Sequence, residues 1–153
     1  MNSDFIPLDG GCLCGAVRFR MTAAPIVTHA CHCRTCQKVS GSAFRINAMI
    51  EADRLEVLAG EPVLFEGADE AKDRRCARCG LVVWSFLPKF GARMAFVGVG
   101  VLDEGERLQP QAHYFIRSRH PWVSLPDDLP AFETLGDPGV EGARDRVMAV
   151  MGG

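Results

Sequence analysis

The sequence lacks the features that mark several protein classes. No apolar run approaches the length of about 20 residues that a transmembrane helix needs, so we expect no membrane span. Residues 1–4 combine no basic cluster with an apolar stretch, so we expect no signal peptide. The formal net charge of -2 gives no electrostatic reason to expect nucleic acid or an anionic membrane as a partner. These absences favour a soluble protein of the cytoplasm.

Common catalytic signatures are missing as well. The chain shows no Ser-His-Asp arrangement, no phosphate-binding glycine loop and no stripe of alternating basic and aromatic residues. Lysine occurs only at Lys38, Lys72 and Lys89, so arginine carries most of the positive charge. The planar guanidinium of arginine binds a carboxylate through two parallel hydrogen bonds, which lysine cannot do, and this is compatible with an acidic small ligand. The length of 153 residues fits one domain that is long enough to bury a core.

Seven cysteines are the most informative residues that the chain does have. They form a C-x-C pair, a C-x-C-x2-C cluster and a C-x2-C pair, at Cys12 and Cys14, at Cys31, Cys33 and Cys36, and at Cys76 and Cys79. In a reducing compartment, close thiols are more often metal ligands than disulfides, and the odd count argues against a disulfide framework. Zinc takes four thiolates in a closed structural site and three protein ligands with an open position in a catalytic site. Seven thiols can supply one site of each kind.

The C-x2-C pair favours a structural zinc site. Gly80 directly follows Cys79, and glycine permits the positive φ that such a tight turn needs. A strand-like run follows this pair, whereas a thioredoxin-like redox pair would open a helix. The pair at Cys12 and Cys14 is the natural partner and would complete a four-thiolate site. A pairing of Cys76 and Cys79 with two members of the middle cluster stays open.

The middle cluster predicts a site of the catalytic kind. In an extended Cys31-His32-Cys33 the two sulfurs point the same way, so His32 should lie behind the ligands or face solvent. His29 is on the same nominal face as Cys31 and could approach the metal, although a satisfied strand histidine is the simpler interpretation. With no evident fourth protein ligand, the open position can take water or a thiol. Zinc would deprotonate that thiol and make it a nucleophile for carbonyl addition.

Many short strands separated by turn signals predict a mainly β domain. The expected strands cover residues 16–21, 26–30, 43–50, 54–58, 63–65, 81–86, 94–101 and 114–116. A single helical turn is expected over 34–39, an extended surface chain over 121–135, and a weak amphipathic helix over 143–151. Trp84 and Phe86 are expected to anchor the core, and the acidic pair Asp127 and Asp128 to lie in a solvated turn.

Taken together, the motifs resemble the glutathione-dependent formaldehyde-activating enzyme family, which includes the centromere protein V relatives. The resemblance is carried by the segments GGCLCGAV, CHCRTCQ, GSAF and CARCG, at residues 10–17, 31–37, 41–44 and 76–80. Residues 113–132 are similar to the C-terminal end of that family. The match covers roughly residues 9–132, and all seven family cysteine positions are cysteine in this chain.

The resemblance implies a β-tent zinc-binding fold with short strands and long loops, over residues 1–135. Residues 136–153 then form a C-terminal tail or short helix. It also implies two zinc ions. Cys12, Cys14, Cys76 and Cys79 would hold the structural one, and Cys31, Cys33 and Cys36 the catalytic-type one.

The activity that the resemblance implies is a reversible addition of glutathione to formaldehyde, formally that of a carbon–sulfur lyase. The expected partners are a small thiol and formaldehyde or a related small electrophile, and the sequence leaves the oligomeric state open. The alternatives are a non-enzymatic zinc-binding interaction module, or a sensor of thiols or metals.

Several residues near the middle cluster are candidates for contacts with a thiol cosubstrate. Gln37 and Ser42, with Ser40, could bind a peptide-like ligand, although capping of the short helical turn explains them equally well. Arg34 and Arg45 could pair with the carboxylates of glutathione. Either of the histidines near the C-terminal end could shuttle a proton, and these are His113 and His120.

Overall fold

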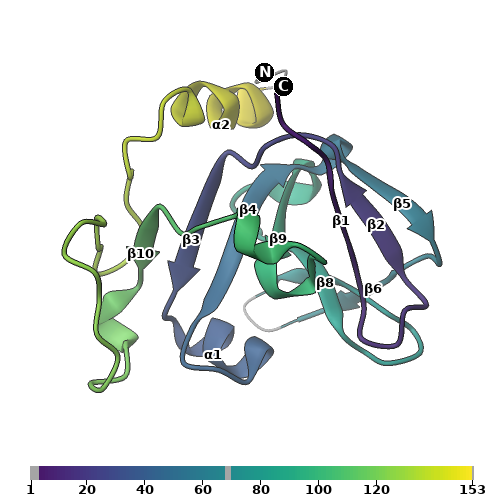
Figure 1. Cartoon of the computed structure of the whole chain (residues 1–153), viewed down its shortest axis with the longest axis horizontal. Coiled ribbons are helices and arrows are strands. Elements are labelled where there is room, and N and C mark those ends of the chain that lie inside the picture. Colours follow the sequence, from purple (N-terminus) through teal and green to yellow (C-terminus); the bar gives the residue numbers. More distant parts are fainter. Residues whose placement is uncertain (1–3, 68–69, 153) are drawn as a thin grey trace.

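The structure is a computed structural model that describes residues 4–67 and 70–152. The first three residues of the domain expected over 1–135 lie outside the described residues. So does residue 153, the last residue of the tail or helix expected over 136–153. Ten strands within the described ranges form two sheets (Figure 1). The small sheet has the order β1-β2-β5, with β1 (Leu8–Gly11), β2 (Arg18–Met21) and β5 (Leu55–Ala59). The prediction of a mainly β fold with short strands and long loops is confirmed.

The large sheet has the order β10-β3-β4-β9-β8-β7-β6 and seven strands. Its strands are, in chain order, β3 (Val27–Cys31), β4 (Arg45–Glu51), β6 (Val63–Glu66), β7 (Lys72–Arg75), β8 (Val82–Phe86), β9 (Met94–Gly98) and β10 (Ala112–Tyr114). All neighbours pair antiparallel except β10, which runs parallel to β3. Among the described residues, two α-helices and several short 3-10 turns complete the fold. The α-helices are α1 (Arg34–Ser40) and α2 (Ala143–Gly152).

The two sheets enclose the main core. In β2 every second side chain is buried, which places Phe19 and Met21 inside. These residues pack with apolar side chains of the large sheet, namely Ile50, Val83, Trp84 and Val97. The ring of Phe19 meets that of Trp84 edge-on, with centroids 5.3 Å apart. The expectation of Trp84 as a core anchor is confirmed, and Phe86 packs partly buried against the same cluster.

Some strand boundaries differ from the sequence-based expectation. The final strand was expected over 114–116, but β10 ends at Tyr114 because Phe115 adopts a left-handed conformation (φ 57°) that cannot continue a ladder. The strand expected over 94–101 ends at Gly98, and a short 3-10 turn follows over Val99–Val101. Strands β1 and β7 were not predicted, since LDGG and KDRR lack the apolar and β-branched residues of typical strands.

The face of the large sheet opposite the main core carries a different set of side chains. Residues directly opposite each other in an antiparallel pair lie on the same face. The register of β3 and β4 therefore places three pairs there, namely Cys31 with Arg45, His29 with Asn47, and Val27 with Met49. β9 adds Phe96, which is opposite Met49. This face is the one on which the candidate site is built.

Helix α2 covers part of that face. Ala143 is buried against Val27 and Met49 in a second apolar cluster, with Val147 and Val150 at its edge. Arg146 ties the helix to β4 through two hydrogen bonds to the carboxylate of Glu51, at 2.8 and 2.6 Å. The helix expected over 143–151 is thus present. None of the helices in the described part of the chain has the length and apolar character to cross a bilayer.

We expect Glu51→Gln to loosen α2, and acidification to do the same in the unmodified protein. Burial alone would raise the pKa of Glu51, but the hydrogen bond from Arg146, a backbone hydrogen bond and the charges of Arg146 and Arg54 together outweigh it and lower the pKa. The stabilisation is therefore present above the ordinary glutamate pKa of about 4.3 and is lost as the pH falls through the lower folded value. At neutral pH the substitution should lower the melting temperature by about 2–4 °C, corresponding to about 1 kcal/mol.

Hydrogen exchange of the α2 amides at neutral pH measures the local effect. Glu133→Gln is a matched control, because Glu133 is an exposed carboxylate on the irregular chain before α2. Equal protection of α2 in both variants would contradict the tethering role of Glu51.

Candidate functional site

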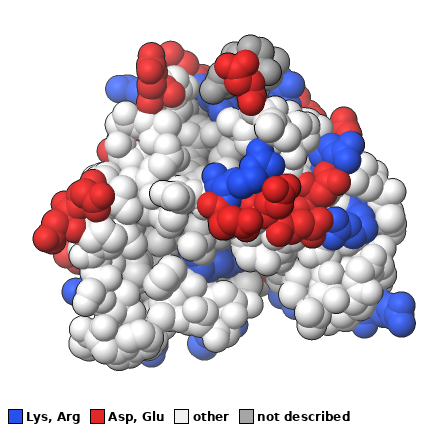
Figure 2. Space-filling model, in the orientation of Figure 1, with Lys and Arg blue, Asp and Glu red and all other residues white. Residues whose placement is uncertain are grey.

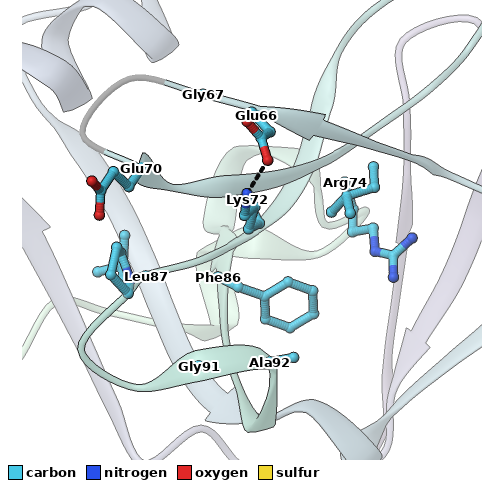
Figure 3. Close-up of a pocket in the computed structure, with 11 residues that line it drawn as sticks. Glu66, Gly67, Glu70, Lys72, Arg74, Phe86, Leu87, Gly91 and Ala92 are labelled. Atoms are coloured by element: carbon cyan, nitrogen blue, oxygen red, sulfur yellow. Dashed lines mark hydrogen bonds and ion pairs between the residues drawn. The ribbon is translucent and has the colours of Figure 1, made fainter.

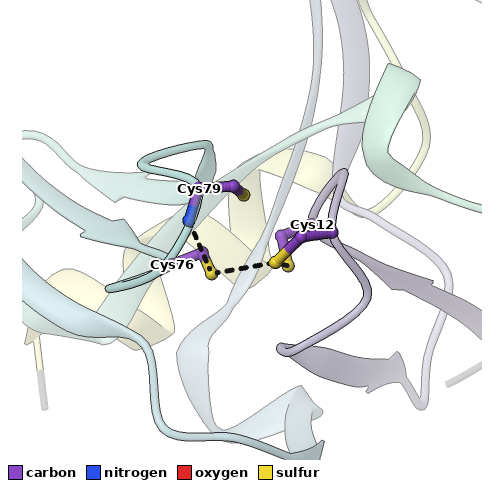
Figure 4. A group of neighbouring side chains, drawn as sticks. Cys12, Cys76 and Cys79 are labelled. Atoms are coloured by element: carbon purple, nitrogen blue, oxygen red, sulfur yellow. Dashed lines mark hydrogen bonds between the residues drawn. The ribbon is translucent and has the colours of Figure 1, made fainter.

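Two turns at the ends of hairpins bring four cysteines together. Cys12 and Cys14 lie between β1 and β2, and Cys76 and Cys79 lie between β7 and β8 (Figure 4). The Sγ atom of Cys14 is 3.6 Å from that of Cys12 and 3.7 Å from that of Cys76. Thiolates bound at 2.3 Å to a tetrahedral zinc ion lie about 3.8 Å apart. The structure therefore groups these two pairs with each other and not with the middle cluster.

Backbone groups prepare this four-cysteine cluster for a cation. The Val17 N–H donates to Cys12 Sγ at 3.3 Å, and the Arg78 and Cys79 N–H groups donate to Cys76 Sγ at 3.3 and 3.4 Å. Burial alone would raise the pKa of Cys12, but the Val17 N–H and the neighbouring thiols lower it to about 6. Gly80 closes the second turn with φ 76°, the conformation expected for it. The donor set and its spacing fit a structural zinc ion.

The second cluster is formed by Cys31, Cys33 and Cys36, whose Sγ atoms all lie within 4.8 Å of one another. Cys31 ends β3, while Cys33 caps the N-terminus of α1 and accepts a hydrogen bond from the Cys36 N–H at 3.4 Å. Hydrogen bonds from the Cys31 and Cys36 thiols lower the pKa of Cys33 to about 2, while the same contacts raise the pKa of Cys31. Cys33 is thus the thiol of the cluster that ionises most readily, and the three neighbouring Sγ atoms fit a metal with an open position.

The three-cysteine cluster opens into a cavity of about 530 Å³. Its floor is the face of the large sheet described above, and its other walls come from α1, from α2 and from the segments around residues 87–90 and 135–138. Val27, Met49 and Phe96 form the apolar part of the floor and are buried. Polar groups of the sheet gather beside the cysteines. The cysteine cluster is therefore a wall of a ligand-sized space.

Arg45 is a half-buried cation in the lining of this cavity. It lies opposite Cys31 in the ladder, and its guanidinium occupies space that Gly98 leaves free, since a Cβ at 98 would lie 2.8 Å from Nη2. Burial lowers the pKa of Arg45, and the negative charges of Cys36 and Asp73 partly offset that effect. Asp73 already bonds to Arg75 and Ser85, so the charge of Arg45 is available to an anionic group in the cavity.

Two further polar side chains point to a bound ligand. His29 lines the cavity with its ring against that of Tyr114, and its Nδ1 atom is buried with no hydrogen-bond partner in the described structure. His29 is a buried residue of β3, as the simpler interpretation expects, but its Nδ1 atom is not satisfied by the described protein atoms. Burial lowers its pKa to about 4, so the ring is neutral at pH 7. The buried Oδ1 of Asn47, on the neighbouring strand, likewise has no partner among the described residues.

The other histidines lie elsewhere. His32 is fully buried behind the three cysteines, as the strand geometry predicts, and its Nε2 is 3.0 Å from Nδ1 of His113. His120 stacks on Trp122. Neither His113 nor His120 lines the cavity, so the structure gives no support to a proton shuttle at either one.

Of the residues expected to contact a thiol cosubstrate, Arg45 lines the cavity, whereas Arg34, Gln37 and Ser42 lie outside its lining. The Gln37 amide donates to the carbonyls of His32 and Ser118 at 2.8 and 3.0 Å, and its oxygen accepts from Arg34 at 3.0 Å. Neither Ser42 nor these two side chains line the cavity, so their contact with a cosubstrate stays a prediction. Ser40 donates to the Cys36 carbonyl at 2.7 Å, in keeping with its capping interpretation.

A second hollow lies beside the hairpin of β6 and β7 and has a volume of about 700 Å³ (Figure 3). Glu66 and Lys72 form an ion pair across it, and the Arg74 guanidinium lies 6.0 Å from the ring centroid of Phe86. None of its eleven lining residues is a cysteine or a histidine. The nucleophilic and metal-binding side chains therefore belong to the first cavity.

The charged groups on the surface are mixed. Figure 2 shows acidic and basic side chains next to each other on the face in view. Ion pairs such as those of Arg20 with Asp9 and Arg18 with Asp103 are of this kind. This face carries no extended field of one sign, in keeping with the small net charge of -2.

Comparison with known proteins identifies relatives of the chain. The family model described as glutathione-dependent formaldehyde-activating enzyme matches residues 7–118. A protein of Halomonas elongata, provisionally named glutathione-dependent formaldehyde-activating enzyme, is 28% identical over 126 residues, which are 77% of this chain and 80% of that protein. A Penicillium rubens protein with the same provisional name is 32% identical over 113 residues, which are 70% of this chain and 59% of that protein.

Among solved structures, a Rhodobacter sphaeroides protein gives a TM-score of 0.49 at 23% sequence identity, covering 63% of this chain and 88% of that one. The family model spans well over half of the chain and includes all seven cysteines. The chain therefore belongs to the glutathione-dependent formaldehyde-activating enzyme family.

Proposed function

We propose that this protein is a carbon–sulfur lyase that adds a small thiol reversibly to an aldehyde, with glutathione and formaldehyde as the pair that its family suggests. The observation that carries the proposal is the opening of the three-cysteine cluster into a ligand-sized cavity. The names of the relatives from Halomonas elongata and Penicillium rubens support the same pair of reactants. The absence of a membrane-spanning helix from the described chain adds no constraint on where the reaction occurs.

We assign two zinc ions to the protein. Cys12, Cys14, Cys76 and Cys79 would hold one in a closed site that contributes only stability. Cys31, Cys33 and Cys36 would hold the other, which would supply the acidity that keeps a bound thiol deprotonated at neutral pH.

The residues around the open position act on the aldehyde. The thiol sulfur forms a bond to the carbonyl carbon while the C=O π bond breaks, so negative charge develops on the oxygen. The half-buried charge of Arg45 stabilises that oxygen electrostatically, and His29 donates to it in the tautomer that carries a proton on Nδ1. Asn47 Oδ1 accepts from the hydroxyl group once the oxygen is protonated by water.

Exchange NMR on mixtures of glutathione and formaldehyde tests the proposal. Protein with two bound zinc ions should speed the interconversion of glutathione and its hydroxymethyl adduct above the rate in buffer. The same protein after removal of the metal from the three-cysteine cluster should show only the buffer rate. An unchanged rate with both clusters loaded would refute the proposal. The uncatalysed addition is itself fast, so the comparison needs low thiol concentrations and matched pH.

A sensor of thiols or oxidants is the second candidate. The observation that favours it is the lowered pKa of Cys33 together with its partial exposure, a combination found in reactive cysteines. Zinc release from the three-cysteine cluster by a mild oxidant, with no accelerated exchange in the NMR measurement, would favour this function over the lyase.

A further inference from the structure

We propose that the aldehyde used by this protein carries an apolar side chain, and that this side chain lies between the large sheet and helix α2. The inference rests on the proposed thiol addition and names the class of its carbonyl substrate. Formaldehyde has one carbon and no side chain, so it cannot contact walls that lie beyond the cysteines.

The apolar walls of the cavity come from two elements that are far apart in the sequence. Val27, Met49 and Phe96 form the sheet side, with exposed fractions of 5%, 8% and 7%. Ala143 packs against Val27 and Met49 where α2 meets the sheet. Beyond this contact, α2 lines the cavity with Val147 and Met151, which are at i and i+4 and lie on one face of the helix. The two sides enclose an apolar slot.

The size of the slot suits a side chain of several carbons. The volume of about 530 Å³ falls within the range of about 300–1,000 Å³ that is usual for small-molecule sites. Moving the apolar surface of an aldehyde from water to such walls strengthens its binding by a factor of about three to four for each methylene group. A chain or ring of five or six carbons would therefore bind far more tightly than formaldehyde.

The polar groups fix the orientation of the aldehyde. In the pairing of β3 with β4, Arg45 is opposite Cys31, and the next pair on this face is His29 with Asn47. The Nδ1 atom of His29 and the Oδ1 atom of Asn47 have no partner among the described residues, so the carbonyl group belongs at the cysteine end of the cavity. Three charged lining residues are exposed at the mouth, and they are the cations Lys89 and Arg144 and the anion Asp137. The two positive charges complement the carboxylates of a thiol such as glutathione, which leaves the apolar slot to the aldehyde.

The reaction balances without an additional reagent. The thiol loses its S–H proton to water, its sulfur bonds to the aldehyde carbon as the C=O π bond breaks, and the former carbonyl oxygen takes a proton from water. The product is a hemithioacetal, and no atom is oxidised or reduced.

Helix α2 is the wall that we expect to select the aldehyde, and it belongs to the C-terminal part of the chain. Helix α2 lies beyond residues 7–118, the part that the family model matches. It is held over the slot by the ion pair of Arg146 with Glu51. The preference for an apolar aldehyde can therefore differ from that of relatives that share the cysteines.

A series of straight-chain aldehydes tests the proposal on the zinc-loaded protein with glutathione as the thiol. From acetaldehyde to hexanal, kcat/KM should rise about threefold for each added methylene group. Acceleration with formaldehyde but no rise along the series would overturn the inference and leave the proposed function standing. No acceleration with any aldehyde would overturn both.

A binding measurement gives a readout that does not depend on turnover. Hexanamide is an unreactive analogue of hexanal, and its saturation-transfer NMR signal should report occupation of the slot. Val147→Trp should weaken hexanamide binding at least about tenfold, because the indole fills the space that the chain would occupy. Ala149→Trp places the same side chain on α2 outside the cavity lining and should leave binding unchanged. Equal hexanamide affinity in both variants would overturn the inference.

Discussion

Cys76→Ser is expected to destabilise the whole protein, lowering the melting temperature by about 10–20 °C. Cys76 is 2% exposed, and its Sγ atom accepts two backbone N–H groups while it contacts Cys14. A serine hydroxyl there is a poor zinc ligand, so the metal that joins the two turns would be lost. If loss of the zinc ion lowers the free energy of unfolding by about 5 kcal/mol, the melting temperature falls by about 10–20 °C, because 1 kcal/mol corresponds to about 2–4 °C for a chain of this size.

Thermal unfolding with measurement of bound zinc checks this expectation. Leu13→Ser is the matched control, since Leu13 lies in the partner turn between two ligands and is 87% exposed. It should change stability by no more than about 0.5 kcal/mol. If Cys76→Ser melts together with the control and still binds two zinc ions, the four-cysteine cluster is not a structural site.

The second large effect concerns catalysis and not stability. Cys33→Ser should remove one zinc ion and reduce the accelerated thiol exchange about 100-fold or to the buffer rate, whichever is higher. The fold should persist, because Cys33 lies at the start of the short helix α1 and outside the main core. Serine is also a good N-cap residue, so α1 keeps its cap.

Circular dichroism, zinc content and exchange NMR together separate the two roles. Lys38→Ser is a suitable control, since Lys38 is an exposed residue on α1 that does not line the cavity. A Cys33→Ser protein that unfolds would show that the cluster is needed for the fold. Full exchange activity in a folded Cys33→Ser protein would contradict the catalytic role.

The local parts of the site could be predicted from the sequence because they depend on neighbours in the chain. The gaps between Cys31, Cys33 and Cys36 place three thiols together whatever the rest of the fold does. The short gaps within the other pairs likewise predict two turns. Which pairs meet depends on the path of the whole chain, and the grouping of Cys14 with Cys76 became definite only in the structure.

The remainder of the site depends on strand register, which sequence periodicity does not reveal. Period-2 alternation places Arg45, Asn47 and Met49 on one face, but not opposite His29 or Cys31. The role of Asn47 was missed for this reason. The position of α2 was missed because its main polar contact joins Arg146 to a residue 95 positions earlier in the chain.

The link between the two cysteine turns bears on how the chain folds. Cys14 and Cys76 are 62 positions apart, so the four-cysteine cluster cannot form until β7 and the turn that follows it have been synthesised. The chain between Cys14 and Cys76 must close into a long loop before a metal can bind both cysteine pairs and stabilise their contact. Contacts between residues so far apart in the sequence slow folding. During synthesis, the first pair of thiols therefore remains open to oxidation or to a foreign metal. The yield of native protein should then depend on the zinc supply at the time of translation.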